Sequence, residues 1–459
     1  MHPIPGELTT PNYSSYRDPA ARVVKRADGW YRYIFKAYQK EFDHLTQSGL
    51  YTELVQKCLM ISYQEVETDN SDSAIYKMIR PEQIAFQSYP FEWSYNQWRK
   101  ALIALLDINS IALKYGMILK DATPYNFYLT QGKAVLLDTT SFILFTPNDP
   151  WVAYRQFCEE FLGPVALMRY NGVSWGKLTM AALRGLGLPF ISRQLPGRSK
   201  LDPTCLLHIH LHARYTGKKG KAKKGFTAEK LLSLFAMLRS AANSWDKPYS
   251  HKGHWEGYYD EGNASYIAAK ESIVSRWLSE IRPDTTIDLG TNTGRFAFLA
   301  AKYARQVIGV DFDAYCVDLA EKIIEKESLA NIIALSADLA QLSPALGMMS
   351  KEYPSLLERA RSDMALGLAL VHHLCINMNI SLVQVAELFA AFGEQYAIVE
   401  FVPEDDNRVV QLIANRGGVF TGYSEELFVT AFSAHFDLVE EARVSPTKRK
   451  LYLFKKRSG

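Results

Sequence analysis

The stretch "TIDLGTNTGRFAFLAAKYARQVIGVDFD", from Thr286 to Asp313, constrains the fold of this chain more than any other feature. It has the pattern of an apolar strand, a glycine-containing turn, a helix and a second strand that ends in an acid. From Thr285 onward, helices alternate with seven short apolar segments, which are "TIDLG", "VIGVD", "IIALSAD", "MALGLALV", "AIVEFV", "FDLVEEARV" and "LYLFK". The last two lie close enough in sequence to pair as an antiparallel edge hairpin. This succession predicts an α/β fold with a doubly wound, mostly parallel sheet of seven strands.

The chain has 459 residues (52.0 kDa), which at about 150 residues per domain predicts two or three domains. We expect an N-terminal α+β domain at 1–213, a linker with a connecting helix at 214–244 and the α/β domain at 245–459. Five lysines and three glycines lie within Gly217 to Gly225. They predict either a patch that binds RNA or phosphate, or an extended solvated loop, and we favour the loop.

The composition limits the kinds of binding partner and the cellular compartment that we expect for this chain. The formal net charge is only +3, so generic nucleic-acid binding is not favoured, although the lysine run leaves it open. No apolar run approaches the ~18–20 residues that cross a bilayer, and the first residues do not resemble a secretion signal. We therefore expect a cytoplasmic protein without a membrane partner. The scattered cysteines predict buried free thiols rather than disulfides or a zinc site.

Three acids follow three successive predicted strands. Asp288 and Gly290 end the first strand, and the turn that follows closes with Gly294 at a helix start, where free N–H groups favour a ligand. Asp311 ends the second strand, where a carboxylate can accept both hydroxyls of a ribose. Asp338 follows the third strand, where it can accept a hydrogen bond from the amino group of an adenine. As a dinucleotide fingerprint the motif is poor, because Asp288 precedes the first glycine.

These residues resemble the first motif of the class I SAM-dependent methyltransferases, from about Tyr258 to Lys456. The resemblance implies a Rossmann-like sheet and S-adenosyl-L-methionine (SAM) as cofactor, with the cationic end of SAM beside Asp288. The residues that it implies for cofactor binding are Asp288, Gly290, Asn292, Gly294, Asp311, Phe312, Asp338, Leu339 and Gly367. Asn292 stands where the family has glycine, but asparagine tolerates left-handed backbone angles.

The same resemblance places the methyl acceptor at the end of the fourth strand, "MALGLALVHHLCI". His373 or His372 could act there as a general base, because a pKa near 6.5 suits proton transfer at neutral pH. Neighbours on an extended segment point oppositely, so we expect one histidine, His373, to face the site. Glu400 is a second candidate base, with a structural salt bridge as the alternative. Tyr259 could close over the sulfonium through a cation–π contact, or pack in the core.

The segment "LKDATPYNFYL" raises a second possibility for the N-terminal domain. Asp121 and Asn126 are five residues apart, and Asp138 follows twelve residues later in "AVLLD". This spacing looks like that of the protein-kinase and aminoglycoside-phosphotransferase superfamily, in which the first acid orients a hydroxyl while the asparagine and the later acid hold magnesium. Lys77 resembles the phosphate-pairing lysine of that family, with Glu41 as a conceivable partner.

The same domain lacks the upstream glycine-rich loop, and Asp138 is followed by Thr139-Thr140. We therefore favour a kinase-like domain that binds the acceptor or acts as a scaffold. An active phosphotransferase using Asp121, Asn126 and Asp138, or a wholly non-catalytic scaffold, are the alternatives. The chain as a whole resembles bacterial nodulation-protein-like SAM methyltransferases, which would move a methyl group to an oxygen or nitrogen of an acceptor that the sequence does not identify. It does not reveal the oligomeric state either.

Three alternating histidines, His208, His210 and His212, would share one face of a strand and could hold a metal there. Their flanks look helical, and no acid or cysteine nearby completes a ligand set. We therefore expect no metal site.

Overall fold

The computed structural model describes residues 15–67, 72–215, 226–249, 264–416 and 422–457. The chain forms two compact units. The first comprises Met1–Leu129, Lys133–His251 and Ala345–Pro354, and the second comprises Thr130–Gly132, Lys252–Pro344 and Ser355–Gly459.

The first unit is an α+β structure built on a four-stranded antiparallel sheet with the order β1-β2-β4-β3. The strands of the whole unit are β1 (Ala21–Arg26), β2 (Gly29–Phe35), β3 (Tyr63–Val66), β4 (Ile75–Pro81), β5 (Met117–Leu119), β6 (Phe127–Thr130), β7 (Lys133–Leu136) and β8 (Phe142–Leu144). Its helices are α1 (Gln39–Gln47), α2 (Leu50–Gln56), α3 (Tyr95–Lys114), α4 (Tyr154–Phe157), α5 (Gly163–Asn171), α6 (Leu188–Gln194), α7 (Pro203–Cys205), α8 (His212–Tyr215) and α9 (Ala228–Ser244). The pairs β5–β8 and β6–β7 form two small separate sheets.

Helix α3 leads into the loop that carries Asp121. It begins with a capping box, in which Gln97 Oε1 accepts a hydrogen bond from the Ser94 N–H at 2.9 Å and Ser94 Oγ accepts one from the Gln97 N–H. The chain turns out of the helix at Gly116, whose φ of +71° few other residues adopt. Helix α3 and this turn together fix where the loop that carries Asp121 begins.

Helix α9 belongs to the first compact unit. We expected 214–244 to connect two domains, but α9 packs on α3 of the first unit and buries Leu231, Phe235 and Leu238 there. An Arg239–Asp107 ion pair adds a polar contact between the two helices. The first compact unit runs to His251 and takes in Ala345–Pro354 as well, while the domain bounds at 213 and 245 stay a prediction. The lysine-rich run lies outside the described residues.

The second unit is the seven-stranded sheet that the sequence predicts, and its order is β11-β10-β9-β12-β13-β15-β14. Its strands are β9 (Thr285–Leu289), β10 (Gln306–Asp311), β11 (Ile332–Ser336), β12 (Ser362–Gly367), β13 (Gly393–Phe401), β14 (Phe436–Arg443) and β15 (Lys450–Lys456). The first five are parallel, and β15 and β14 form the antiparallel edge pair. The central strands are buried on both faces, which explains their continuous apolar runs.

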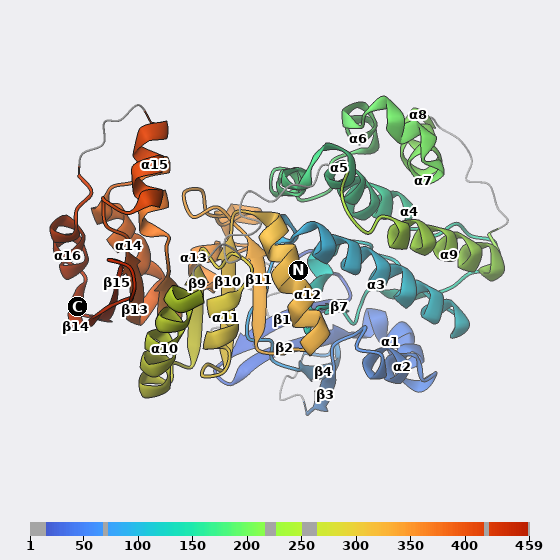
Figure 1. The fold of residues 1–459 in the computed structure, drawn as a ribbon. Coiled ribbons are helices and arrows are strands. Elements are labelled where there is room, and N and C mark those ends of the chain that lie inside the picture. Colours follow the sequence, from blue (N-terminus) through green and yellow to red (C-terminus); the bar gives the residue numbers. More distant parts are fainter. Residues whose placement is uncertain (1–14, 68–71, 216–225, 250–263, 417–421, 458–459) are drawn as a thin grey trace. The chain divides into compact units, whose positions relative to one another are not determined.

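The helices of this unit are α10 (Ala264–Ile281), α11 (Arg295–Ala300), α12 (Ala314–Glu327), α13 (Leu356–Arg359), α14 (Leu382–Phe392), α15 (Asn407–Asn415) and α16 (Glu425–Ser433). Helices α10, α11 and α12 lie beside the strands of this sheet (Figure 1). Their side chains form one apolar core with it, which includes Trp277, Phe296 and Ile324. Helices α14 and α16 pack against each other through Phe389 and Phe432. The strand order reverses between β9 and β12, which is where sheets of this kind bind ligands.

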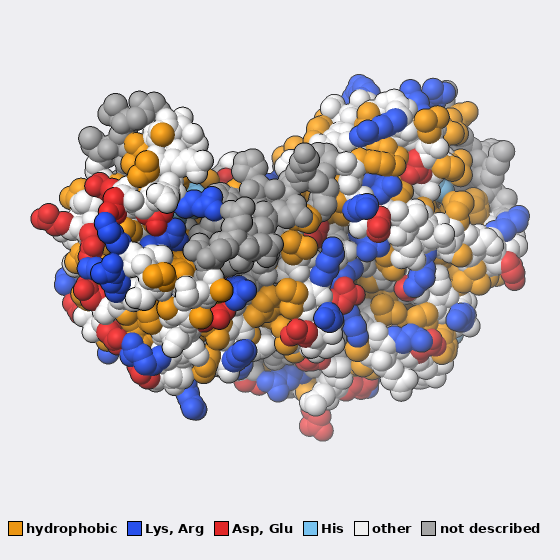
Figure 2. All heavy atoms as spheres, viewed as in Figure 1, with side chains coloured by type: hydrophobic (Ala, Val, Ile, Leu, Met, Phe, Trp, Pro, Cys, Tyr) orange, Lys and Arg blue, Asp and Glu red, His pale blue; other side chains and the backbone are white. Residues whose placement is uncertain are grey.

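The described surface and the cysteines test two expectations from composition. Lys and Arg side chains are interspersed with Asp and Glu on the face shown in Figure 2, which accords with the small net charge. All five cysteines are free, and four are buried, but Cys58 is exposed, so the expectation of burial is wrong for that residue. None of the described helices is both long enough and apolar enough to cross a bilayer.

Candidate active site

The turn after β9 is shaped by residues with positive φ. Gly290, Asn292 and Gly294 have φ of +74°, +51° and +90°. A Cβ atom on Gly294 would lie 2.7 Å from the Phe298 ring, so only glycine fits at this helix start. Asn292 adopts the left-handed angle that the sequence suggested, and its side-chain oxygen accepts a hydrogen bond from the Thr293 N–H at 2.7 Å.

A pocket of about 290 Å³ lies at the carboxyl ends of strands β9 to β12. Its size is just below the usual range of about 300–1,000 Å³ for small-molecule sites. Its lining residues are Gly290, Asn292, Val310, Asp311, Phe312, Ala337, Asp338, Leu339, Leu368, Ala369, Leu370, His373, Leu374, Asn377 and Met378. Six of the nine residues expected to bind the cofactor are among them.

Asp311 is the most firmly fixed acid of the pocket. Its Oδ2 accepts a hydrogen bond from the Asn292 N–H at 2.8 Å, and its Oδ1 accepts one from the Asp313 N–H at 2.9 Å. Burial raises the pKa of Asp311 to about 6, although these two N–H groups favour the ionised form. The carboxylate is therefore ionised at pH 7, is held rigidly and ties the end of β10 to the glycine turn.

The other lining residues that the sequence identified surround this acid. Asp338 follows β11, and its Oδ1 accepts a hydrogen bond from the Ala340 N–H at 2.9 Å. Phe312 is 46% exposed, which leaves part of its ring available for contact with a flat ligand. With Leu339, these residues give the pocket a mixed apolar and acidic wall on the side of β10 and β11.

Asp288 does not line the pocket, contrary to the expectation. Its side chain is 2% exposed and lies behind the glycine turn, where its Oδ2 accepts a hydrogen bond from the Thr291 hydroxyl at 2.8 Å. Burial raises the pKa of Asp288 to about 6, and the Thr291 hydroxyl opposes that shift. Asp288 thus holds the turn from below and contributes negative charge to the site from there.

Gly294 and Gly367 also lie outside the pocket lining. Gly294 acts through the backbone of the turn. At Gly367, a Cβ atom would lie 2.1 Å from the Phe389 ring, so this position is small because α14 packs tightly on β12. This packing explains the small residue at Gly367, while its expected contact with the cofactor stays a prediction.

The two histidines lie on a helical turn rather than on an extended segment. Strand β12 ends at Gly367, and the π-helical turn η10 spans His373–Asn377. The two imidazole ring centres are 4.2 Å apart, so the argument from opposite strand faces was wrong. His373 nevertheless lines the pocket, with its Nδ1 at 3.3 Å from Asn377 Nδ2. His372 is 1% exposed and does not line it.

The lowered pKa values of both histidines disfavour strong general-base catalysis. Burial lowers the pKa of His373 to about 4, and the charges of Arg408 and Arg449 add to the effect. Burial also lowers the pKa of His372 well below its ordinary value, and His372 Nδ1 has no hydrogen-bond partner. Both rings are therefore neutral at pH 7, and His373 is a weak base there.

Glu400 is a structural residue. It is fully buried, its Oε2 lies 2.5 Å from Lys270 Nζ, and its Oε1 accepts a hydrogen bond from the Tyr266 hydroxyl at 2.5 Å. Both carboxylate oxygens are engaged and Glu400 does not line the pocket, which favours the alternative of a structural salt bridge over the role of a base. Tyr259 lies outside the described residues.

Several lining residues carried no chemical signal in the sequence. Leu368, Leu370 and Met378 are ordinary apolar residues, and Asn377 follows the histidines by one helical turn. Ala369 has a φ of +53°, which turns the chain from β12 into the helical segment. Only a fold-level argument, that the end of β12 faces the site, could have indicated them.

The acids of the first unit are brought together as the second motif suggested. Asn126 Nδ2 lies 3.2 Å from Asp121 Oδ2 and 3.3 Å from Ser141 Oγ. Asp138 Oδ2 accepts a hydrogen bond from the Ser141 hydroxyl at 2.7 Å. Burial raises the pKa of Asp121, and the charge of Asp138 adds to this effect. The three side chains thus form one hydrogen-bonded cluster.

Arg32, which the sequence did not single out, closes this cluster. Its guanidinium donates to Asp138 Oδ1 in a salt bridge whose side chains are 13% and 18% exposed. Burial opposes ionisation, yet Arg32 and neighbouring hydroxyls lower the pKa of Asp138 to about 2. Asp138 Oδ1 also accepts hydrogen bonds from the N–H and hydroxyl of Thr140. The guanidinium of Arg32 is therefore already paired with Asp138, the acid to which the motif assigns magnesium binding.

Lys77 pairs with Glu65 on the neighbouring strand β3, at 2.6 Å, rather than with Glu41. The side chains of this pair are 39% and 47% exposed, so it is a surface contact. The predicted likeness of Lys77 to a phosphate-pairing lysine gains no support from this geometry.

The three alternating histidines lie on helical turns, where His208 and His212 both contact Tyr154 and His210 contacts two serines. His208 Nδ1 bonds the Tyr154 hydroxyl at 2.6 Å, and the two nitrogens of His210 lie 2.8 Å from the hydroxyls of Ser192 and Ser199. In the described part of the chain, no three His, Cys, Asp or Glu side chains are grouped to hold a metal.

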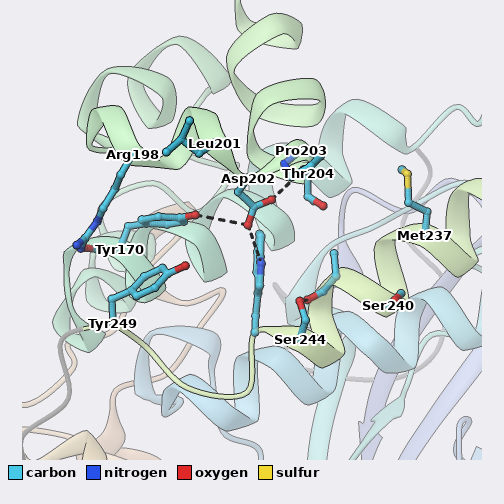
Figure 3. A pocket seen from close by; sticks show the side chains of 12 residues that line it. Tyr170, Arg198, Leu201, Asp202, Pro203, Thr204, Met237, Ser240, Ser244 and Tyr249 are labelled. Atoms are coloured by element: carbon cyan, nitrogen blue, oxygen red, sulfur yellow. Dashed lines mark hydrogen bonds between the residues drawn. The ribbon is translucent and has the colours of Figure 1, made fainter.

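The first unit has a second, open hollow of about 650 Å³ between α9 and the segment around α7 (Figure 3). The acid that lines this hollow is Asp202. Its Oδ2 accepts a hydrogen bond from Trp245 Nε1 at 3.0 Å and another from the Tyr170 hydroxyl at 3.4 Å. The other oxygen caps α7. Because the acid is engaged within the fold, this hollow offers less chemistry than the pocket of the second unit.

No family model matches the chain. Nodulation protein NoeA of Rhizobium meliloti (strain 1021) is 26% identical over 472 residues, which cover 99% of this chain and 97% of that protein. Among solved structures, the chain is similar to magnesium protoporphyrin IX methyltransferase (ChlM) from Synechocystis PCC 6803 with bound SAH, at 16% identity and a TM-score of 0.33. That match covers 44% of this chain and 92% of ChlM.

N-methyltransferase NodS from Bradyrhizobium japonicum WM9 is similar at 12% identity and a TM-score of 0.33, over 43% of this chain and 99% of NodS. Other structures of ChlM and NodS hold SAM and SAH, respectively. At these identities and TM-scores the likenesses assign no activity to this chain, so its function has to be argued from the geometry of the site.

Proposed function

We propose that the second unit binds SAM and transfers its methyl group to an oxygen or nitrogen nucleophile. The observation that carries the proposal is the pocket at the reversal of strand order, in which Asp311 and Asp338 follow neighbouring strands beside an open glycine turn. Carboxylates at this edge suit the hydroxyls and the amino group of an adenosine. The net negative charge of the turn region suits a cation better than a pyrophosphate.

The lining residues divide between the parts of such a ligand. Asp311 would accept hydrogen bonds from the ribose hydroxyls, and Asp338 one from the adenine amino group. Phe312 and Leu339 would contact the flat faces of the base. The turn at Gly290 and Asn292 would hold the methionine end, with the charge of Asp288 behind it. When bound there, SAM supplies a methyl group that is activated by its sulfonium.

His373 is the candidate contact for the methyl acceptor, because it lines the pocket at the end of β12. As a neutral ring it can accept a proton from the nucleophile only weakly. The site therefore favours a nucleophile that needs little deprotonation, and most of the rate would come from fixing the attack line and distance. We include His373 as a proton acceptor and exclude Glu400 from that role.

For the first unit we propose a kinase-like module that binds the acceptor or acts as a scaffold. The salt bridge between Arg32 and Asp138 supports this over an active phosphotransferase, because it supplies the positive charge that magnesium would otherwise provide. An active phosphotransferase is the second candidate function, and it requires Arg32 to leave Asp138.

Calorimetric titration of the full chain with SAM and with Mg-ATP tests both proposals. We expect heat with SAM, a loss of about 30-fold in affinity for Asp311→Ala, and no heat with Mg-ATP; the loss corresponds to about 2 kcal/mol of charge-assisted hydrogen bonding. Heat with Mg-ATP alone, abolished in Asp138→Ala, would instead favour the phosphotransferase. Labelling of extracts with methyl-tritiated SAM then identifies the class of acceptor.

A further inference from the structure

One helical segment of the first unit turns apolar side chains toward solvent. It spans 203–215 and comprises α7, α8 and the turn between them. Its inward face carries His208 and His210, which are buried and bond hydroxyl groups of the fold. On its outward face, Leu207 is 52% exposed and Tyr215 is 66% exposed. A surface helix ordinarily has polar residues outward, so this reversed arrangement indicates contact with a partner or a membrane.

The exposed apolar surface continues from this helix to the open hollow of the first unit (Figure 3). Leu201, two residues before the helix, is 85% exposed and lines the hollow together with Pro203. Met237 of α9 lines it too and is also exposed. Single exposed apolar residues are common on protein surfaces, but here they gather from two elements around one concave surface.

The same stretch is strongly basic. Residues 193–215 contain four cations, which are Arg193, Arg198, Lys200 and Arg214. Asp202 is the one acid in that sequence, and both of its oxygens are engaged within the fold. The sequence continues with five lysines and no acid as far as Gly225, so 193–225 carry a formal charge of +8, against +3 for the whole chain. Figure 2 shows Lys, Arg and hydrophobic side chains side by side over α6 and α8.

This combination favours an anionic lipid surface over a nucleic acid. Cations contact phosphate groups in both cases. A nucleic acid would leave the exposed leucines in water, whereas the boundary between the headgroups and acyl chains of a bilayer takes up leucine and tyrosine side chains. The expectation of no membrane partner rested on the lack of an apolar run long enough to cross a bilayer. A segment that lies on the membrane surface needs no such run.

We propose that segment 197–215 of the first unit binds the surface of a bilayer that contains anionic lipids. Leu201 and Leu207 enter the boundary between headgroups and acyl chains, and Lys200 and Arg214 contact the headgroup phosphates. Neither the apolar nor the basic part is sufficient alone, because each supplies only part of the binding free energy. The inference is independent of the proposed SAM site.

Sedimentation of the full chain with lipid vesicles tests the proposal, at about 0.15 M salt. We expect binding to vesicles of equimolar phosphatidylcholine and phosphatidylglycerol, and much weaker binding to phosphatidylcholine alone. Leu201→Ser combined with Leu207→Ser should weaken binding to the mixed vesicles about tenfold. Lys200→Gln combined with Arg214→Gln should weaken it about 25-fold, because each cation near an anionic surface contributes about fivefold. Thermal unfolding should be unchanged in both variants, since the four side chains are exposed.

Two matched controls alter exposed residues outside this stretch. Val152→Ser combined with Val383→Ser removes two apolar side chains that are 64% and 54% exposed. Lys36→Gln combined with Lys40→Gln removes two exposed positive charges of the first unit and lowers the net charge as much as the test pair does. Both controls should bind the mixed vesicles like the unaltered chain.

Weaker binding in both test variants, with unchanged controls, supports the inference. Failure of the unaltered chain to sediment with the mixed vesicles overturns it. Undiminished binding of the leucine variant, or an equal loss in the Lys36 and Lys40 control, also overturns it, because the attraction would then be a general effect of charge. Binding to a short single-stranded RNA without binding to vesicles would make the stretch a nucleic-acid surface. Failure to bind SAM would remove the proposed function but would leave the vesicle result as it is.

Discussion

Both units carry an aspartate at or just beyond the end of a strand, beside a loop that could hold a ligand. The two aspartates differ in the groups that already surround them. Asp138 in the first unit accepts hydrogen bonds from Arg32, Thr140 and Ser141, and its pKa is lowered to about 2. Asp311 in the second unit accepts only backbone N–H groups and lines an open pocket, and burial raises its pKa to about 6.

This difference distinguishes an acid that is available to a ligand from an acid that only stabilises the fold. Asp138 is neutralised by a cation of the fold itself, whereas the acids of the second unit retain negative charge that a ligand can neutralise. An acid that is buried and lacks a cation is costly in the free protein, and it is retained where a ligand later uses it. Four experiments test this contrast.

The largest effect is expected when the internal cation of the first unit is removed. Arg32→Ala leaves Asp138 with no cation, which we expect to cost about 3 kcal/mol, the low end for broken buried pairs because both side chains keep some exposure. Urea unfolding of the full chain measures the loss, and Arg32→Ala with Asp138→Ala should recover part of it. Recovery of Arg32→Ala by millimolar Mg²⁺ would break the contrast, because the acids would then accept a metal.

The second effect concerns the pH dependence of stability in the second unit. The pKa of Asp288 is about 6 in the folded protein and 3.8 ordinarily, so between these values the folded state binds more protons. The contribution of Asp288 to stability therefore falls as pH rises from about 4 to 6, by about 3 kcal/mol at most. The difference in unfolding free energy between the unaltered protein and Asp288→Asn, at pH 4.5 and 7, measures it. A difference that does not change with pH would mean that Asp288 is not the titrating group.

The third effect sharpens the division of roles within the pocket. If Asp338 accepts a hydrogen bond from the adenine amino group, Asp338→Ala should weaken SAM binding about tenfold, the value of one hydrogen bond to a charged group. The inosine analogue of SAM, which lacks that amino group, should bind both proteins equally. Calorimetry with the two ligands gives the result. An equal loss for both would place the adenine elsewhere.

The smallest effect is expected at Lys77. Its pair with Glu65 is exposed, so Lys77→Ala should change stability by less than about 0.5 kcal/mol and leave SAM affinity unaltered. Thermal unfolding and SAM titration together measure it. A large loss of an ATP-dependent activity in this variant would show that Lys77 contacts phosphate, and the scaffold proposal would fail.

The sheet of the second unit was predictable because its signals are local. Apolar runs of five or six residues ended by glycine or aspartate place the strands, and Asn292 and Gly294 have the positive φ that their residue types suggested. The acids at the ends of β10 and β11 follow directly from that pattern. Parallel strands bring their carboxyl ends to one edge, so Asp311 and Asp338 had to lie near each other.

The remaining features depended on contacts between distant segments. Lys270 and Glu400 are 130 residues apart, and Arg32 and Asp138 are 106 apart, so neither pairing leaves a local pattern. The histidines were assigned to an extended segment because the apolar run "MALGLALV" continues past Gly367, where β12 ends, without a change in residue type. Gly367 was expected to contact a ligand, since the sequence does not show that Phe389 packs against it.

The packing of α9 on α3 bears on how the two halves of this chain can be produced separately. A fragment that stops near residue 213 would uncover the apolar side of α3 and lack the partner of Asp107, and we expect it to aggregate. A fragment that extends through Tyr249 keeps the hydrogen bond from the Tyr95 hydroxyl to the Trp245 carbonyl at 2.9 Å. A cut after Tyr249 therefore keeps α9 on α3, but it still removes Ala345–Pro354, which also belongs to the first unit and packs Tyr353 against Tyr89, so no single cut yields a complete first unit.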